Sequence, residues 1–310
     1  MAAPVRIGTR GSALALWQAN HVKALLEPVL GPIELTIIKT SGDKNQTDPL
    51  SKIGASAGGK GLFVKEIEEA LLDRSVSIAV HSSKDLPSVL PDGLVLAAFP
   101  LREDPRDALL SKGGNTLGSL PKGAVIGTSS LRRMTQIKAV RPDLECADLR
   151  GNVDTRVRKL DEGSYHAIVL AVAGLKRLGF GNRISGYLGP PEMIPAVGQG
   201  ALGIEMRADD PLREKVAAAL DHPQTRAAVE AERSFLATLE GGCTIPVGAY
   251  AQVDSAGRLS IEGLIASPST IVRGTDAAAM SDAVVLGRRL AESLLAKGGR
   301  EILELIRSGA

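Results

Sequence analysis

The sequence has few aromatic residues, no long apolar run and almost no charge imbalance, and each shortage excludes a class of protein. Aromatics make up 3% of the 310 residues, too few for the stacking platforms on which single-stranded nucleic acids bind. The 37 basic and 35 acidic residues give a net charge of +2, whereas nucleic-acid-binding domains usually carry a basic excess. No segment approaches the roughly 20 apolar residues that cross a bilayer. We therefore expect neither nucleic-acid nor membrane partners.

Cysteine and histidine are also scarce. Two cysteines, Cys146 and Cys243, are too few for the disulfide framework of a small secreted protein. The start of the chain, Met1–Gly8, has no apolar stretch of the kind found in secretory signals. The four histidines show no ligand-like spacing, so no metal site is expected. These features together predict a protein of the reducing cytoplasm.

What the sequence does contain is arginine. The basic residues comprise 23 Arg and 14 Lys. Arginine is favoured over lysine where a planar carboxylate or a phosphate is held by paired hydrogen bonds. The hydrophobic share of 44% and the charged share of 23% are those of a folded globular protein, and the length suggests two or three domains.

Short apolar runs alternate with helical patterns through the first two thirds of the chain. This alternation predicts two α/β lobes whose sheets are mixed but mostly parallel. Two segments rich in Pro and Gly, Pro100–Asp107 and Met193–Gly200, are predicted hinges between the lobes. The expected strands and helices are Val5–Gly8, a helix capped by Ser12, Ile33–Ile37, Ser77–His81, Ala124–Gly127, Leu131–Val140, Glu145–Leu149, Thr155–Leu160 and Ala167–Ala171.

The last 90 residues follow another pattern. Helices are expected over Leu212–Leu220 and Arg226–Leu239. Alternating apolar residues on both sides of the turn Asp254–Gly257 predict an antiparallel hairpin, to which Ile271–Arg273 adds a strand. Two further helical patterns end the chain. We interpret this part as a small C-terminal α+β domain.

The turn Gly127–Arg133 is the first candidate site. A strand leads through Ser129 and Ser130 into a helix whose first turn carries Arg132 and Arg133. Helix N-termini bind anions, and cations at this end oppose the helix dipole. A bound anion would offset that conflict, so we favour an anionic ligand here. The alternative is a serine cap followed by solvated arginines.

Four further arginines follow predicted strands. Arg10 follows the first strand, Arg150 comes after the strand ending at Leu149, Arg156 lies in the helix that follows, and Arg177 lies shortly beyond the next strand. Ligands of open α/β lobes bind at the carboxyl ends of the strands. Each arginine alone is better explained as a surface charge, but the set predicts a ligand with several carboxylates or phosphates.

The segment His81–Pro87 also ends a predicted strand. Within it, Asp85 is a candidate general acid or base, or a group that stabilises a cation. Lys84 is placed to bind an anion or to lower the pKa of Asp85. The alternative is an ordinary polar turn before Pro87, with His81 packed in the strand.

Cys243 follows two glycines between a helix and a strand. Glycines let the backbone approach a ligand, and a thiolate there is able to hold a covalent group. A small buried residue at a tight turn is the alternative. Cys146 lies inside a strand pattern and is interpreted as structural.

These segments resemble hydroxymethylbilane synthase, also called porphobilinogen deaminase, a family of tetrapyrrole biosynthesis. The similarity runs through nearly the whole chain, at the spacing of the family. The motifs that carry it are Ile7–Gln18, Gly59–Glu66, His81–Pro87, Arg102–Asp107, Gly127–Arg133, Leu149–Val153, Leu170–Leu178, Pro195–Gly200 and Glu240–Cys243.

The resemblance implies a transferase of heme biosynthesis that condenses four porphobilinogen molecules head to tail, with loss of ammonia, on a dipyrromethane cofactor bound to Cys243 through a thioether. Hydrolysis then releases linear hydroxymethylbilane. Asp85 matches the catalytic aspartate. By the same resemblance the cofactor is held by Lys84, Asp85, Ser129, Ser130, Arg132, Arg133, Arg150 and Arg156, and the substrate by Arg10, Ser12, Arg150, Arg156, Arg177 and Gln199.

The resemblance also implies an architecture of two lobes like those of periplasmic binding proteins, plus the C-terminal domain, in a monomer. The expected domains are 1–100 with 200–218, then 106–194, then 223–310, and the chain returns to the first lobe after Gly200. Lys60 and Phe63 match a mobile loop beside the cleft. The competing interpretation is a non-catalytic two-lobed binding protein for a polycarboxylate, which would need neither Cys243 nor the third domain.

Overall fold

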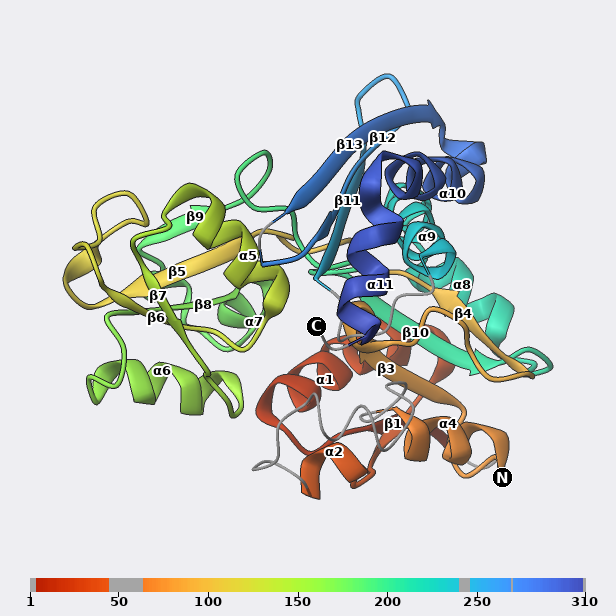
Figure 1. The fold of residues 1–310 in the computed structure, drawn as a ribbon. Coiled ribbons are helices and arrows are strands. Elements are labelled where there is room, and N and C mark those ends of the chain that lie inside the picture. Colours follow the sequence, from red (N-terminus) through yellow and green to blue (C-terminus); the bar gives the residue numbers. More distant parts are fainter. Residues whose placement is uncertain (1–3, 45–63, 240–245, 269, 309–310) are drawn as a thin grey trace.

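The structure is a computed structural model that describes residues 4–44, 64–239, 246–268 and 270–308. Two lobes, each built on its own sheet, lie beside a third part made of strands β11–β13 and helices α9–α11 (Figure 1). In the described residues, no helix combines the length and the apolar composition that crossing a bilayer requires.

The first lobe contains a five-stranded sheet in the order β2-β1-β3-β10-β4. Strand β10 is antiparallel to both of its neighbours, whereas β1 is parallel to β2 and β3. The elements of this lobe are β1 (Val5–Thr9), α1 (Ala13–Leu30), β2 (Ile33–Ile37), α2 (Ser41–Lys44), α4 (Lys65–Leu72), β3 (Ile78–Ser82), a 3₁₀ turn (Ser83–Asp85), β4 (Leu94–Ala98), β10 (Leu202–Arg207) and α8 (Arg213–Leu220).

The second lobe repeats this arrangement with the order β7-β6-β8-β5-β9. Here β5 is the strand that runs against its neighbours. Its elements are β5 (Asp107–Ser111), β6 (Val125–Gly127), α5 (Leu131–Val140), β7 (Glu145–Ala147), α6 (Val153–Asp161), β8 (Ala167–Ala171), α7 (Val172–Arg177) and β9 (Gly186–Leu188). The expected mixed, mostly parallel sheets are thus confirmed in both lobes.

In the two lobes, the strands that run antiparallel to both of their neighbours are β5 and β10. Each is the first strand after the chain crosses between the lobes. The crossings are the two segments predicted as hinges, and they contact each other. Glu103 N donates to Gly200 O at 3.3 Å, and Gln199 Nε2 donates to Pro105 O at 2.7 Å. Gly200 has a φ of +89°, and a Cβ there would lie 2.3 Å from Glu103 O, so only glycine allows this approach.

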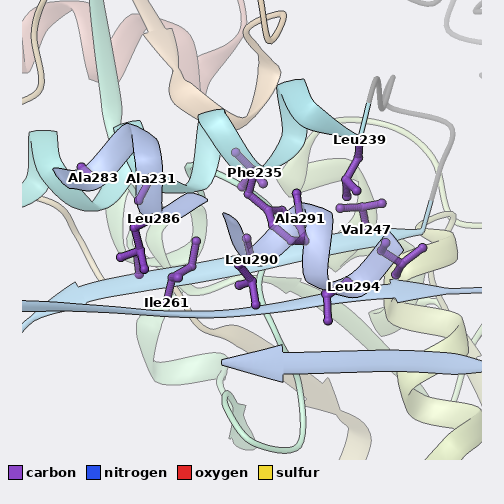
Figure 2. Close-up of a cluster of buried hydrophobic side chains, with 14 of the residues drawn as sticks. Ala231, Phe235, Leu239, Val247, Ile261, Ala283, Leu286, Leu290, Ala291 and Leu294 are labelled. Atoms are coloured by element: carbon purple, nitrogen blue, oxygen red, sulfur yellow. The ribbon is translucent and has the colours of Figure 1, made fainter. Parts of the chain in front are cut away.

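The third part is an antiparallel sheet, β11-β12-β13, covered by helices. Phe235 and Leu290 pack with Ile261 in its core (Figure 2). The helices α9 and α10 cross closely, since a Cβ at Gly287 would lie 2.0 Å from Ala231 O. The elements are α9 (Pro223–Thr238), β11 (Val247–Val253), β12 (Arg258–Ala266), β13 (Ile271–Ala279), α10 (Ala283–Leu294) and α11 (Arg300–Ser308). The predicted α+β fold of this part is confirmed.

Some element bounds differ from the expectation. The strand expected over Glu145–Leu149 ends at Ala147, and the strand expected at Ile271–Arg273 continues to Ala279. Strands β4, β5, β9 and β10 were not predicted individually. In β10 all six residues are buried, Glu205 and Arg207 included, so its sequence lacks the apolar signal of a buried strand.

A buried ion pair joins the third part to both crossings. Arg102 Nη1 lies 2.6 Å from Glu232 Oε1, and Glu232 is fully buried on α9. The same carboxylate accepts from Gly198 N at 2.6 Å and from Ala251 N at 2.8 Å. Glu232 therefore holds one residue from each crossing and one from β11.

We expect Glu232→Gln to destabilise the protein by about 3–5 kcal/mol, because it leaves the Arg102 charge buried without a counter-ion. Urea unfolding followed by circular dichroism measures the change. Asp276→Asn is the matched control, since it breaks the more exposed pair with Arg289 and should cost less than about 1 kcal/mol. Equal unfolding midpoints for the two variants would contradict this role of Glu232.

Candidate functional site

A cavity of about 320 Å³ opens between the two lobes. From the first lobe it is lined by residues at the ends of β1 and β3 and at the start of α1. From the second lobe it is lined by the segment 150–156 and by residues of β8 and α7. Gly200 and Ala201 of the second crossing also contribute. The cavity thus lies at the carboxyl ends of strands in both lobes, where ligands of such sheets bind.

Positive charge dominates this cleft. Among the described residues, the charged side chains that line it are six cations and two carboxylates, namely Arg10, Lys84, Arg133, Arg150, Arg156, Arg177, Asp85 and Asp154. An excess of cations around one cavity is suited to a ligand with several negative groups. Most of the arginines expected at strand ends are therefore brought together as predicted.

Local structure explains how the first lobe presents its side chains. Arg10 directly follows β1, and Ser12 caps α1 by accepting from Ala15 N at 3.3 Å. Lys84 and Asp85 lie in the 3₁₀ turn that follows β3. The expected cap at Ser12 and the expected place of Asp85 beyond its strand are both confirmed.

The second lobe contributes arginines that are anchored by the backbone. Arg156 Nε donates to Gly151 O at 2.7 Å, and Arg177 Nη2 donates to Gly200 O at 2.8 Å. The Arg177 guanidinium also lies 5.7 Å from the centre of the Trp17 ring, a cation–π distance. These contacts fix the direction of each guanidinium before any ligand binds.

Burial shifts the pKa of several of these cations. Burial lowers the pKa of Arg156 to about 10, helped by the charge of Arg133, and lowers the pKa of Arg177 to about 10. Burial also lowers the pKa of Lys84 to about 8, against the opposing effect of Asp85. Each shift means that the charged form lacks compensation, and a ligand carboxylate would provide it.

Asp85 is a carboxylate among the cations of the cleft. Its carboxylate is exposed to the cleft. In the part of the chain that the structure describes, it makes no hydrogen bond or ion pair, although Lys84 precedes it and Arg156 is near enough to feel its charge. A carboxylate with all its acceptor sites unused is able to contact a cation or an N–H group of a ligand.

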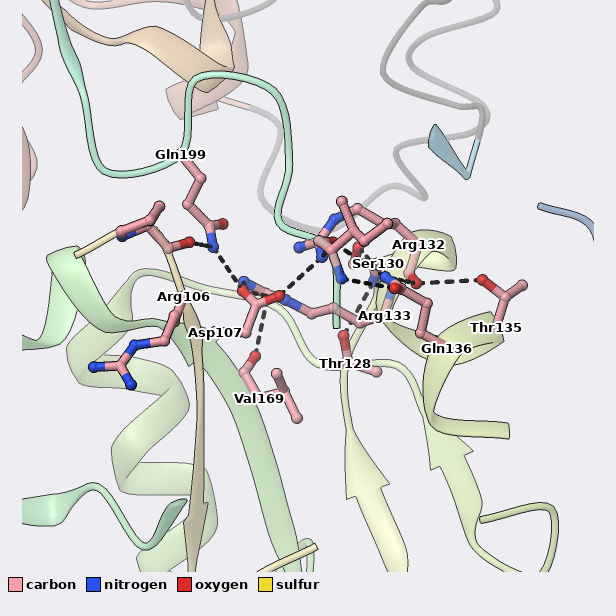
Figure 3. Close-up of polar contacts among 12 residues, drawn as sticks. Arg106, Asp107, Thr128, Ser130, Arg132, Arg133, Thr135, Gln136, Val169 and Gln199 are labelled. Carbon is pink, nitrogen blue, oxygen red and sulfur yellow. Dashed lines mark hydrogen bonds and ion pairs between the residues drawn. The ribbon is translucent and has the colours of Figure 1, made fainter. Parts of the chain in front are cut away.

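Behind the cleft, the carboxylate of Asp107 gathers three predicted ligand-binding residues (Figure 3). Arg132 Nη1 donates to Oδ2 at 2.8 Å, while Arg133 Nη2 and Gln199 Nε2 donate to Oδ1 at 2.7 and 2.9 Å. Asp107 is fully buried. Burial alone would raise its pKa, but the charges of Arg132 and Arg133 outweigh burial and hold the pKa well below its ordinary value.

This network explains how two arginines are tolerated at the start of α5, where the helix dipole disfavours positive charge. Arg132 and Arg133 are buried rather than solvated, so the alternative of solvated arginines is wrong. The anion that offsets them is the side chain of Asp107. Arg133 also lines the cleft, whereas Arg132 and Gln199 do not. Asp107 belongs to the motif Arg102–Asp107, yet sequence reasoning assigned it no role.

The two serines of this turn also bond to the protein. Ser130 is the N-cap of α5 and accepts from Arg133 N at 3.4 Å. Ser129 Oγ donates to Leu149 O at 2.7 Å and accepts from Leu149 N at 3.1 Å. Neither serine lines the cavity. Ser129 thereby ties the turn after β6 to the segment that carries Arg150, while Ser130 caps the helix.

Three predicted residues, Cys243, Lys60 and Phe63, lie outside the described residues. Cys146 lies in β7, where burial raises the pKa of its thiol. A thiol with a raised pKa is a poor nucleophile at neutral pH, which agrees with a structural role. Sequence reasoning missed Gln18, whose Nε2 donates to Ser82 Oγ at 2.8 Å at the cleft wall.

Comparison with known proteins gives consistent matches. Residues 5–215 match the family described as "Porphobilinogen deaminase, dipyromethane cofactor binding domain", and residues 226–296 match "Porphobilinogen deaminase, C-terminal domain". The porphobilinogen deaminase of Syntrophobacter fumaroxidans is 50% identical over 97% of each chain. That of Nitratidesulfovibrio vulgaris strain Hildenborough is 52% identical over 98% of this chain and 97% of its own.

Among solved structures, immunogenic lipoprotein A from Vibrio vulnificus matches with a TM-score of 0.43 and 12% identity, over 69% of this chain and 94% of its own. An arginine-specific periplasmic binding protein from Salmonella typhimurium matches with a TM-score of 0.37 and 14% identity, over 70% and 92%.

The cleft should bind polycarboxylates in a pH-dependent way. Citrate titrated calorimetrically into protein freed of any covalent ligand should bind less tightly as the pH rises through about 8, because Lys84 then loses its proton. The loss should be roughly 10- to 100-fold, the value of one charge-assisted hydrogen bond. Lys84→Arg keeps its charge throughout this range and should remove the decline. A decline that persists unchanged in Lys84→Arg would exclude Lys84 as its source.

Proposed function

Since the chain belongs to the porphobilinogen deaminase family, we propose that its arginine-rich cleft is where porphobilinogen units are joined and that Asp85 is the catalytic carboxylate. The activity of the family is the activity of this chain. It is a transferase of tetrapyrrole and heme biosynthesis that condenses four porphobilinogen molecules with loss of ammonia and releases hydroxymethylbilane.

The residues of the cleft fit the family's cofactor. A dipyrromethane carries acetate and propionate groups, and the six cations around the cavity are a donor set for such carboxylates. When bound, the cofactor supplies the pyrrole carbon to which the first substrate is joined. We propose that Cys243 holds it through a thioether, so that intermediates stay attached to the protein.

We propose that the side chains divide between cofactor and substrate. The proposed cofactor residues that line the cleft are Lys84, Asp85, Arg133, Arg150 and Arg156, and the proposed substrate residues that line it are Arg10, Ser12, Arg150, Arg156 and Arg177. Ser129, Ser130, Arg132 and Gln199 lie behind the cavity wall, where they hold the turn after β6 and the Asp107 carboxylate.

The observation that carries the role of Asp85 is its unpaired carboxylate among cations. Loss of ammonia from porphobilinogen leaves a cationic carbon centre, and a nearby carboxylate stabilises that charge. Lys84 and Arg156 bind and orient the carboxylates that flank the reacting carbon.

A non-catalytic binding protein for polycarboxylates is the second candidate. It would share the lobes and the arginines of this cleft. An unpaired carboxylate inside the cavity argues against it, because Asp85 would repel an anionic ligand and weaken its binding. A pure binding protein also gains nothing from a covalent anchor at Cys243.

The chain's organisation follows the same proposal. We assign residues 1–100 with 200–218, residues 106–194 and residues 223–310 to three domains, and Lys60 and Phe63 to a loop beside the cleft. The balanced charge and the shortage of aromatics and cysteine support a cytoplasmic monomer without nucleic-acid partners.

Cys243→Ser should yield a protein that lacks the covalent mass increment of a dipyrromethane and nearly all activity, because the serine hydroxyl is a far weaker nucleophile. Intact-mass spectrometry and an ammonia assay measure both. Cys146→Ser is the control and should keep the increment and the turnover. A normal increment in Cys243→Ser would place the attachment elsewhere.

Asp85→Asn keeps the side chain's shape and loses its charge, so single-turnover ammonia release should slow by roughly 100- to 1,000-fold. Asp85→Glu retains the charge, displaced by a methylene, and should be faster than Asp85→Asn. The effect should fall on turnover more than on substrate binding, since the charge it stabilises exists only fleetingly. Release at the wild-type rate in Asp85→Asn would reduce Asp85 to a turn residue before Pro87.

A further inference from the structure

A second, smaller cavity of about 60 Å³ lies against the first-lobe wall of the cleft. It shares Arg10, Ser12 and Asp85 with the large cavity, so the two spaces adjoin at these side chains. Its inner wall includes His81 of β3. Asp85 lies four residues further along the chain, in the turn that follows this strand. The small cavity therefore connects the surroundings of Asp85 with the interior of the first lobe.

His81 faces a buried carboxylate there. Its Nε2 lies 3.0 Å from Glu205 Oε2 on the neighbouring strand β10, and the side chains are 4% and 0% exposed. The two atoms are not aligned for a hydrogen bond, and within the described residues neither oxygen of Glu205 has a hydrogen-bond partner. A fully buried carboxylate with no hydrogen bond is rare, because it loses its hydration without replacement.

Glu68 of α4 brings a second carboxyl to the same place. In the sheet register, Gly203 is opposite His81 and Glu205 is opposite Ala79, so His81 and Glu205 share one face of the sheet. Helix α4 packs on that face, and Glu68 is buried with its Oε1 unpartnered. Burial, and next the charge of Glu205, raise the pKa of Glu68 to about 7, while His81 opposes them.

The other charged groups near this cluster have partners elsewhere. Arg207 lies on the same face of β10 as Glu205, but its guanidinium binds Leu71 O, Val76 O and Asp210. Arg233 of α9 feels the charge of Glu205, but its Nη2 donates to Pro87 O at 2.8 Å. Glu69 adds further negative charge near Glu68, and Glu230 does so near Arg233. In residues 4–44, 64–239, 246–268 and 270–308, no three His, Cys, Asp or Glu side chains are arranged to hold a metal ion.

Protons are the remaining compensation. Burial, together with the charge of Glu205, holds a proton on Glu68 up to about pH 7. Glu205 Oε2 lies 3.0 Å from His81 Nε2, so these two side chains are placed to pass a proton between them.

We propose that His81, Glu205 and Glu68 form a buried proton-storing cluster that serves the condensation at Asp85 through the small cavity. Each condensation breaks a C–N and a C–H bond and forms a C–C bond. The C–N electron pair leaves with ammonia, while the C–H proton needs a base. The cluster accepts that proton by way of the small cavity and later returns it to ammonia, which leaves as ammonium. The inference rests on the proposed role of Asp85.

None of the three residues lines the large cavity, so they act as positioning and proton-storing residues rather than as catalytic ones. Their loss should change the pH dependence of the reaction more than the binding of substrate. A merely structural cluster would affect stability and leave the pH profile alone.

The test uses the cofactor-loaded, full-length enzyme with Glu68→Gln, Glu205→Gln and the matched control Glu69→Gln, which removes an exposed carboxylate from the same helix. Single-turnover ammonia release is measured against pH. Wild type and Glu69→Gln should share a change in rate near pH 7, and Glu68→Gln should lose it and be slower on the order of 10-fold. A wild-type profile in Glu68→Gln would overturn the proposal.

Carbon-13 NMR of glutamate side chains in the same proteins gives a readout independent of activity. One carboxyl should titrate near pH 7 in wild type, disappear in Glu68→Gln, and titrate at lower pH in Glu205→Gln, where the repulsion is gone. Wild-type protein without such a carboxyl would also overturn the proposal, whatever the variants do. Slow release in Asp85→Asn with an unchanged Glu68→Gln profile refutes the cluster alone, whereas wild-type release in Asp85→Asn refutes the proposed function.

Discussion

Asp107 carries a negative charge into the interior of the protein, at the first residue after the chain crosses to the second lobe. Arg132 and Arg133 come to it from α5, and Gln199 comes from the returning crossing. A buried charge is tolerated only when it is paired and hydrogen-bonded, so this carboxylate and its three partners constrain one another. The start of α5, the two crossings and the cleft-facing side of Arg133 are thereby fixed together.

The cleft built on this network has more positive than negative charge. Burial depresses the pKa of Lys84, Arg156 and Arg177, which shows that their charged forms are held at a cost that a polycarboxylate ligand offsets. Asp85 is a carboxylate without a hydrogen bond or ion pair to the described residues, in a cleft where cations prevail. On the proposed function the arrangement separates two tasks: the cations would bind the carboxylates of the growing chain, and Asp85 would stabilise the transient positive charge of the reaction.

Much of this could be predicted from the sequence, for reasons that particular residues illustrate. Periodicity predicted α5 and β8 with their observed bounds, because their apolar spacing is regular. The rule that ligands bind at strand ends predicted that Arg10, Arg150 and Arg177 line one site, as they do. Strand β10 was not predicted because Glu205 and Arg207 interrupt its apolar pattern although both are buried. Arg207 donates to the carbonyls of Leu71 and Val76, which lie far away in the chain, and no local pattern reveals such partners. The role of Asp107 was not predicted either, because its partners Arg132, Arg133 and Gln199 are also distant in the sequence.

We propose that cations hold the growing chain while Asp85 drives its elongation. Quench-flow mixing with limited porphobilinogen, followed by intact-mass analysis, tests it most directly, because each added unit raises the mass of the covalent protein by a fixed step. In wild type we expect a series of protein masses, one for each added unit. In Asp85→Asn we expect only the mass of the protein with its cofactor, and in Arg177→Ala we expect chain growth to stop at an intermediate length. A full series of masses in Asp85→Asn, formed at the wild-type rate, would contradict the account.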